Sequence, residues 1–400
     1  MTEQPLQLHD LSFVSEGDEV VVGRLNTGSY AVFPADGVEL LRRLGEGMPL
    51  SQAAAWYERN FGEPVDVDEF AITLTELGFV REPGTERDPV PALRLRWLGR
   101  VVFSPAAWTC YAVIAGLWLL AARRNGALLP HPSQFFFAGS LVLVQAVVIT
   151  AQVPLLFWHE GCHILAGRRL GLPSRMRVSN RLMYIVFETQ LNGLNSVPRR
   201  ARYLPFLAGL AGDGIVFCSL GLIAELSRPG SGAYPLAGRL CLALAFTVAM
   251  RMAWQLQLYL RTDLYYVFAT ALNCHDLHDA STALLRNRIW RALRRTHRVV
   301  DEQQWTPRDR KVAAFYGPFI ILGAFVMVLI TIFGSFPVAR EYVATIARDL
   351  VNSPLSAHFW DGLASLSFNV AQIVALIVLS RRKRRQLAGR RPHLLERKAG

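Results

Sequence analysis

The most restrictive feature of this sequence is its set of long apolar runs, because about twenty apolar residues suffice to cross a bilayer as a helix. Six such runs occupy residues 102–122, 134–165, 204–226, 237–260, 312–333 and 362–379. Of the 400 residues, 52% are hydrophobic, which exceeds the usual content of a soluble domain. The sequence therefore predicts an α-helical polytopic membrane protein with about six transmembrane helices in a lipid bilayer.

The placement of the basic residues predicts the orientation of these helices. The net charge is +12, and arginine-rich segments follow the second, fourth and sixth runs. The last of these segments is Arg381-Arg382-Lys383-Arg384-Arg385. Residues 1–9 lack the basic start and apolar core of a cleavable signal. By the positive-inside rule we expect a multi-pass protein of the cell membrane with both termini and the basic tail 381–400 in the cytoplasm. We do not expect nucleic-acid binding.

The second run carries a polar motif, His159-Glu160-Gly161-Cys162-His163. On a helix, two histidines four residues apart lie on one face and can bind one Zn²⁺, with the intervening glutamate placed as a general base. Two unrelated histidines on a helix are the alternative interpretation. Ionisable side chains at membrane depth are costly and usually functional, which favours the metal site. The motif predicts Zn²⁺-dependent hydrolysis of a peptide bond, with His159 and His163 as ligands and Glu160 as the base.

A hydrolytic zinc site usually has three protein ligands, so a third ligand is needed. The candidates are Glu188, Asp213, Asp263, His275, Asp276, His278 and Asp279. Asp263 is favoured because the second and fourth runs should both end on the cytoplasmic side. Asp213, in the third run, is the second choice. It could instead pair with Arg251 or accept a hydrogen bond from a ligand histidine, and a structural role ranks first.

The segment before the membrane runs, residues 1–87, predicts a separate α+β domain. Strands are expected at 19–25 and 29–33, and helices at 36–44, 51–61 and 66–77. Asp36, Ser51 and Asp66 are suitable residues to cap the three helices. This order predicts a winged-helix-like fold, followed by a linker at 88–101 and the membrane domain at 102–380. Residues 182–188 predict strands of a hairpin at the membrane surface, whose edge could hold an extended peptide.

The front domain is similar to PqqD-like leader-peptide recognition domains in its segments GRLNTGSYAVF, ADGVELLRRLGEG and LTELGFV. In that family the leader of a precursor peptide adds as a strand to a sheet edge beside a helix. The resemblance implies a groove formed by the edge near Val20–Leu25 and the third helix. A winged helix used only for packing or dimerisation is the alternative.

The membrane domain resembles the site-2 protease family of intramembrane zinc metalloproteases. The resemblance combines the His-Glu-x-x-His helix, two further runs and the segment Thr262-Asp263-Leu264, where the family has Leu-Asp-Gly and this chain lacks the glycine. The segments RTDLYYV, RLMYIVFET and VPRRARYLPFLAG are similar to the bacterial peptide zinc metalloprotease branch, over residues 102–298. The resemblance implies that Asp263 is the third zinc ligand.

The two resemblances together lead us to expect a zinc metalloendopeptidase that removes the leader of a ribosomally synthesised peptide held by the front domain. Three alternatives remain. The protein could release a membrane-anchored regulator by intramembrane proteolysis, act as a non-catalytic peptide-binding or export partner, or be a transporter.

Overall fold

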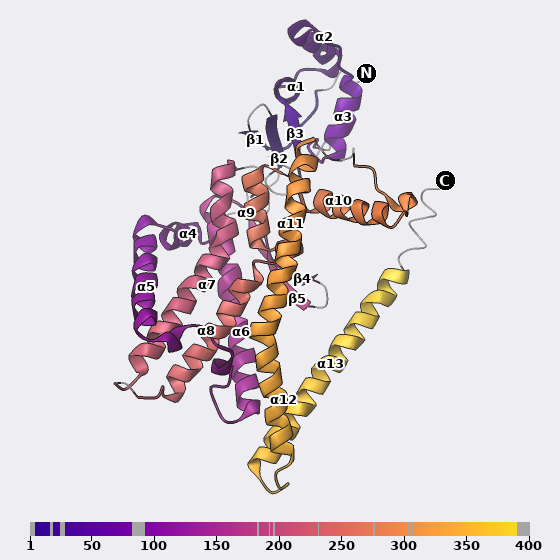
Figure 1. Ribbon diagram of the computed structural model, residues 1–400. Helices are drawn as coiled ribbons and strands as arrows, with labels where there is room; N and C mark the ends of the chain where they lie inside the picture. Colours follow the sequence, from indigo (N-terminus) through magenta and orange to yellow (C-terminus); the bar gives the residue numbers. More distant parts are fainter. Residues whose placement is uncertain are drawn as a thin grey trace.

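The computed structural model describes residues 5–16, 19–24, 29–81, 93–181, 184–191, 193–194, 197–230, 232–274, 277–302, 305 and 307–389 (Figure 1). In this part of the chain, six helical stretches are long and apolar enough to cross a membrane. They are α5 (Pro105–Arg124), α6 (Leu141–Arg169), α7 (Arg199–Ser227), α8 (Leu236–Trp254), the continuous stretch Pro307–Leu350 and α13 (Ala357–Gly389). The expected helical class is confirmed, with six helices that have the length and composition of membrane spans.

Two of the predicted apolar runs have different boundaries in the structure. Helix α8 ends at Trp254 rather than at residue 260, and the chain turns through the short 3-10 helix η4 (Leu258–Leu260) into α9 (Asp263–Leu272). The fifth run is longer than expected, because α11 (Pro307–Ile330) continues through a π-helical turn (Thr331–Ser335) into α12 (Phe336–Leu350). Hydropathy alone could not separate the apolar residues of η4 from those of the helix before it.

Helices α6, α7 and α8 lie side by side and form the centre of the membrane part (Figure 1). Small residues on α7 allow close approach, which is the usual basis of helix packing in membranes. Ala208, Gly209 and Gly212 are all buried there.

The far end of α6 is held by α13 (Figure 1). The carboxylate of Asp361 accepts hydrogen bonds from the backbone nitrogens of Leu141 (2.6 Å) and Val142 (3.2 Å) and from the hydroxyl of Ser140 (2.5 Å). A negative charge at a helix N-terminus satisfies otherwise unpaired N–H groups and complements the helix dipole. This contact caps the N-terminus of α6.

The N-terminal domain has its own core and is largely as expected. Strands β1 (Leu11–Glu16), β2 (Glu19–Arg24) and β3 (Tyr30–Pro34) form an antiparallel sheet, followed by α1 (Ala35–Gly45), α2 (Leu50–Phe61) and α3 (Val67–Glu76). The side chains of Val22, Leu40, Leu41, Leu44, Leu74 and Phe79 fill the space between them. Strand β1 was missed by the sequence analysis because its residues, LSFVSE, have few strand-forming side chains in alternation.

Three expectations for this domain need correction. Strand β2 is paired on both sides, so the edge expected near Val20–Leu25, whose last residue lies outside the described residues, is not free; among the described strands the outer positions belong to β1 and β3. Asp66 caps α3 through the backbone nitrogen of Glu69, as predicted. Asp36 and Ser51 instead lie inside the first turns of α1 and α2. The Tyr57 hydroxyl donates to the Asp36 carboxylate, which raises the pKa of Tyr57 to about 12.

The expected linker and the expected tail both contain helical segments. Residues Arg96–Val102 form the helix α4 inside the expected linker, and Gly99 packs so closely on α6 that a Cβ there would lie 2.3 Å from the Leu165 carbonyl oxygen. Helix α13 continues to Gly389, through the first part of the expected tail.

The remaining elements complete the chain. They are η1 (Gly126–Leu128), η2 (Pro132–Phe135), the antiparallel hairpin β4 (Ser174–Arg181) and β5 (Tyr184–Leu191), α10 (Leu277–Ala292) and η5 (Thr296–Arg298). Strand β5 confirms the strand expected within 182–188 for residues 184–188, while residues 182–183 lie outside the described residues, and the hairpin packs against α6.

Candidate metal centre

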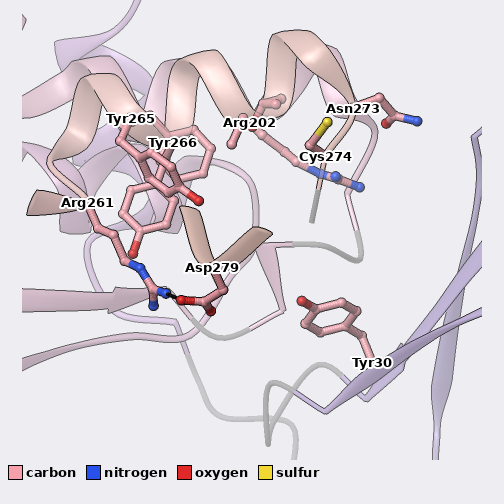
Figure 2. Close-up of a pocket in the computed structure, with 11 residues that line it drawn as sticks. Tyr30, Arg202, Arg261, Tyr265, Tyr266, Asn273, Cys274 and Asp279 are labelled. Carbon is pink, nitrogen blue, oxygen red and sulfur yellow. Dashed lines mark hydrogen bonds and ion pairs between the residues drawn. The ribbon is translucent and has the colours of Figure 1, made fainter. Parts of the chain in front are cut away.

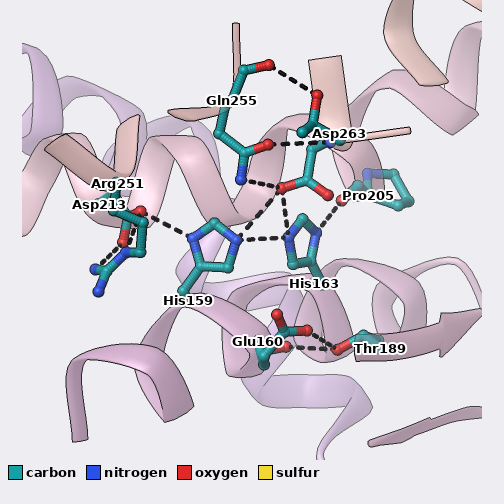
Figure 3. A network of polar contacts seen from close by, with 10 residues as sticks. His159, Glu160, His163, Thr189, Pro205, Asp213, Arg251, Gln255 and Asp263 are labelled. Atoms are coloured by element: carbon teal, nitrogen blue, oxygen red, sulfur yellow. Dashed lines mark hydrogen bonds and ion pairs between the residues drawn. The ribbon is translucent and has the colours of Figure 1, made fainter. Parts of the chain in front are cut away.

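The two motif histidines lie on one face of α6, as the four-residue spacing requires. Both are buried, with exposed fractions of 4% for His159 and 5% for His163. Their Nε2 atoms are 3.2 Å apart (Figure 3). The two nitrogens therefore face a common point.

The carboxylate of Asp263 completes a group of three. Its Oδ2 lies 3.3 Å from Nε2 of His159 and 3.3 Å from Nε2 of His163. The three ligand atoms all lie within 4.8 Å of one another, so the group could hold a metal ion. The break between α8 and α9 makes this possible, because a helix that continued past Trp254 could not turn Asp263 back towards α6.

Gln255 holds Asp263 in this position. Its Nε2 donates to Oδ2 of Asp263 (2.9 Å), and its Oε1 accepts from the Asp263 backbone nitrogen (3.1 Å). The Thr262 hydroxyl donates to the Gln255 carbonyl oxygen (2.8 Å).

The second nitrogen of each histidine ring faces a group that can only accept a hydrogen bond. Nδ1 of His159 lies 2.9 Å from Oδ2 of Asp213, and Nδ1 of His163 lies 2.6 Å from the Pro205 carbonyl oxygen. Each Nδ1 must then carry the hydrogen, which leaves the Nε2 lone pair of each neutral ring free. Such partners fix the tautomer and the ring orientation of metal-ligating histidines.

The resulting arrangement fits a cation. Two Nε2 lone pairs and a carboxylate oxygen point at one another from about 3.2–3.3 Å, and this is repulsive unless a cation or a proton lies between them. Two imidazoles and one carboxylate are a ligand set that Zn²⁺ uses in hydrolases, with a fourth position left for a non-protein ligand.

Asp213 acts behind the histidine and not in the ligand group. It is fully buried, and Arg251 of α8 donates to both of its oxygens, at 2.9 Å from Nε and 2.6 Å from Nη2. Two of the three roles left open by the sequence, pairing with Arg251 and a hydrogen bond to a ligand histidine, thus occur together. A buried carboxylate needs this compensation.

Gly209 lets α7 pass directly over the histidine pair. A Cβ atom at this position would lie 2.3 Å from Nε2 of His163 and 2.6 Å from Nε2 of His159. One turn further, a Cβ at Gly212 would lie 2.6 Å from Sγ of Cys162, and the Trp158 indole donates to the Gly212 carbonyl oxygen (3.1 Å). Both glycines are required by this close helix crossing.

Glu160 is buried on the hairpin side of the histidine pair (Figure 3). The Thr189 hydroxyl of β5 donates to its Oε2 at 2.7 Å. Glu160 does not belong to the ligand group, consistent with the separate role expected for it. The hairpin thus contacts the predicted base directly.

The other candidates for the third ligand lie elsewhere. Asp279 pairs with Arg261, and the backbone nitrogen of His278 donates to the Tyr265 hydroxyl. His275, Asp276 and the side chain of Glu188 lie outside the described residues.

The sequence analysis did not identify Gln255, Thr189, Gly209 or the Pro205 carbonyl as parts of the site. A polar side chain eight residues before the predicted ligand was the available signal for Gln255, and a Gly-x-x-Gly pair in an apolar run was the signal for Gly209. Nothing in the local sequence distinguishes Thr189 or Pro205.

Replacing Asp213 with Asn should weaken metal binding by about 10- to 100-fold, the usual cost of losing a carboxylate behind a ligand histidine. The amide can present an N–H instead of an acceptor to Nδ1 of His159, and Arg251 loses its charged partner. Competition with a chelator of known affinity would measure the change. Asp361→Asn, at the far end of α6, is the control and should leave zinc affinity unchanged.

Comparison with known proteins assigns no family to this chain. No protein-family model, no curated protein and no solved structure matches the chain.

Proposed function

We propose that this protein is a membrane-embedded zinc metalloendopeptidase that removes the leader from a ribosomally synthesised peptide. The observation that carries the proposal is the convergence of two buried histidines from α6 and Asp263 from α9, with the carboxylate of Glu160 beside them. Three candidate ligands meet inside a helical bundle that is apolar enough for a membrane, and the Glu160 carboxylate lies on their hairpin side, bonded to Thr189 (Figure 3).

In this proposal each residue has a distinct task. A Zn²⁺ held by His159, His163 and Asp263 would supply Lewis acidity to the reacting water and carbonyl. Glu160 accepts a proton from the attacking water and returns it to the leaving amine. The Thr189 hydroxyl orients Glu160 through its hydrogen bond to Oε2.

The β4–β5 hairpin is suited to present the substrate to these groups. A protease cleaves an extended chain, and a two-stranded hairpin has free edges to which an extended segment can add. Because Thr189 of β5 touches Glu160, a peptide added along this hairpin passes close to the base.

In this proposal the front domain captures the leader at the outer edge of β3, which the strand order β1-β2-β3 supports. The Arg24 nitrogen donates to the Ser29 carbonyl, so hydrogen-bonded pairs continue at Ala31 and Phe33. The backbone groups of Tyr30 and Val32 therefore point away from β2, towards the open edge. Phe33 packs edge-to-face on Phe70 of α3, which lies alongside.

Asp263→Ala should lower zinc affinity by more than about 100-fold, beyond the range for a residue that only supports a ligand. The variant leaves two imidazoles, which are too few for a hydrolytic site. Zinc per chain after dialysis against a metal buffer is the measurement. Asp279→Ala, an acid on neighbouring α10, should retain zinc. Undiminished zinc in Asp263→Ala would exclude Asp263 as a ligand and remove the basis of the proposed function.

Val32→Pro should block leader capture without unfolding the sheet, because it removes an N–H that points to the open edge. With a peptide that carries a strand-forming leader as the probe, the expected result is a KM raised about tenfold with zinc content unchanged. Ser15→Pro removes the matching outward N–H from the β1 edge and should have no effect on KM. Equal cleavage by Val32→Pro and the parent would exclude the β3 edge as the capture site.

Release of a membrane-anchored regulator is a second candidate function, because the motif histidines lie on an apolar helix of 29 residues. A substrate whose cleavage depends on a spanning helix, and not on a soluble leader, would favour it.

A further inference from the structure

A second polar pocket lies between the N-terminal domain and the membrane part (Figure 2). Its volume is about 180 Å³. It is lined by one residue of β3, by residues of α7, α9 and α10 and by the turns at both ends of α9, chiefly Tyr30, Arg202, Arg261, Tyr265, Tyr266 and Asp279. We call it the Tyr30–Arg261 pocket.

The Tyr30–Arg261 pocket connects the two parts of the proposed enzyme. Tyr30 is the first residue of β3, whose outward backbone groups form the proposed capture edge. Arg261 and Tyr265 stand two residues before and two residues after Asp263. A chain that leaves the β3 edge at Tyr30 therefore meets this pocket next to the segment that carries the third ligand.

The charge of the pocket favours an acidic group. Its lining includes two arginines, Arg202 and Arg261, and one acid, Asp279. At the end of α9, outside the lining, Arg199 donates to the Thr270 carbonyl (2.6 Å) and Arg308 to the Leu272 carbonyl (3.2 Å), and the Asp309 carboxylate beside Cys274 offsets part of their charge. Arginine pairs well with carboxylates because its planar donors match both oxygens.

The pocket is too small for most small-molecule ligands, whose sites have volumes of about 300–1,000 Å³. It suits one side chain. Aromatic rings form part of its wall, with Tyr266 stacked on Phe206 at a centroid distance of 5.3 Å. The strand edge beside it can pair with the backbone that carries such a side chain.

Arg261 is already engaged by an acid. Its Nη2 lies 2.5 Å from Oδ1 of Asp279, and the two side chains are 44% and 61% exposed. Arg261 also has a φ of 53°, in the left-handed region that non-glycine residues rarely adopt. An exposed pair of this kind is weak and can exchange its partner.

We propose that the Tyr30–Arg261 pocket receives an acidic side chain of the captured peptide, which replaces Asp279 as the partner of Arg261. The inference rests on the proposed function, since it assigns the pocket to the peptide substrate. Substrates would then carry an aspartate or glutamate between the strand-forming segment and the cleaved bond.

Peptide selection on the full-length chain tests this inference without any cleavage step. The protein carries Glu160→Gln, is reconstituted in nanodiscs, and is presented with a displayed library of random 12-residue peptides. We expect enrichment of Asp or Glu at a fixed distance from a strand-forming segment. Arg261→Gln should reduce this enrichment about tenfold, and Asp279→Asn should increase it, because the competing carboxylate is removed.

Arg288 is an exposed arginine of α10 outside the pocket. Arg288→Gln is therefore the matched control for non-specific electrostatic attraction of acidic peptides, and it should keep the enrichment. Zinc content confirms that each variant retains the metal centre. Absence of acidic enrichment would overturn the inference, as would equal enrichment in Arg261→Gln and its parent, or no increase in Asp279→Asn. Acidic selection together with a Glu160 parent that cuts none of the selected peptides would leave the pocket assignment standing and refute the hydrolase.

Discussion

Glu160→Gln should abolish peptide hydrolysis while leaving bound zinc at the level of the parent protein. General acid–base catalysis contributes about 10²–10⁴ to a rate, so a loss of at least that size is expected when the base is removed. Glutamine has nearly the same shape, and its Oε1 can still accept the hydrogen bond from the Thr189 hydroxyl. The change therefore removes the proton acceptor and leaves the surrounding packing.

The measurement pairs the rate of precursor cleavage with zinc per chain. Glu225→Gln is the control, because this carboxylate accepts hydrogen bonds from Asn125 and Tyr234 at the other end of α7, away from the histidines. It should keep both cleavage and zinc. Undiminished processing by Glu160→Gln would support a non-catalytic role for the zinc helix as a scaffold for peptide binding or export.

Gly209→Ala should prevent zinc binding and with it all activity. The added methyl group would lie 2.3 Å from Nε2 of His163 and 2.6 Å from Nε2 of His159, far inside van der Waals contact. Either the rings turn away or α7 moves off α6. Both movements separate the ligand atoms, and a displacement of 1 Å already matters at a metal site.

Gly214→Ala is the matched control on the same helix, because its Cβ would meet only Cε of Met252 at 3.8 Å. Alanine is a better helix former than glycine by about 1 kcal/mol, so backbone propensity favours both variants. A loss confined to Gly209→Ala is therefore steric. Normal zinc binding by Gly209→Ala would mean that α7 does not cover the histidines in the way described.

The same close crossing explains why the site needs partners from several helices. Asp213 from α7 and Arg251 from α8 neutralise one another behind His159, which removes the cost of burying either charge alone. Asp263 lies at the start of α9, after the chain has turned out of α8. A hydrogen bond from Gln255 holds its carboxylate. Burying any one of these charged groups in the apolar interior without its partner would cost free energy.

The sequence by itself determined the features that depend on local periodicity. An apolar run of sufficient length forms a membrane-length helix whatever surrounds it, and residues 159 and 163 share a face because a helix repeats every 3.6 residues. The six apolar helices and the pairing of the two histidines followed from these rules. The order of the three N-terminal helices followed from their amphipathic patterns.

The tertiary structure alone decided the features that depend on which surfaces meet. The convergence of Asp263 with residues about a hundred positions earlier requires the turn after Trp254, and an apolar run does not reveal where it ends in such a turn. Gly209 is necessary only because α7 crosses α6 at the histidines, and β2 is central only because β1 pairs with it. Contacts between distant segments arise from packing, whereas propensity and hydropathy act over a few residues.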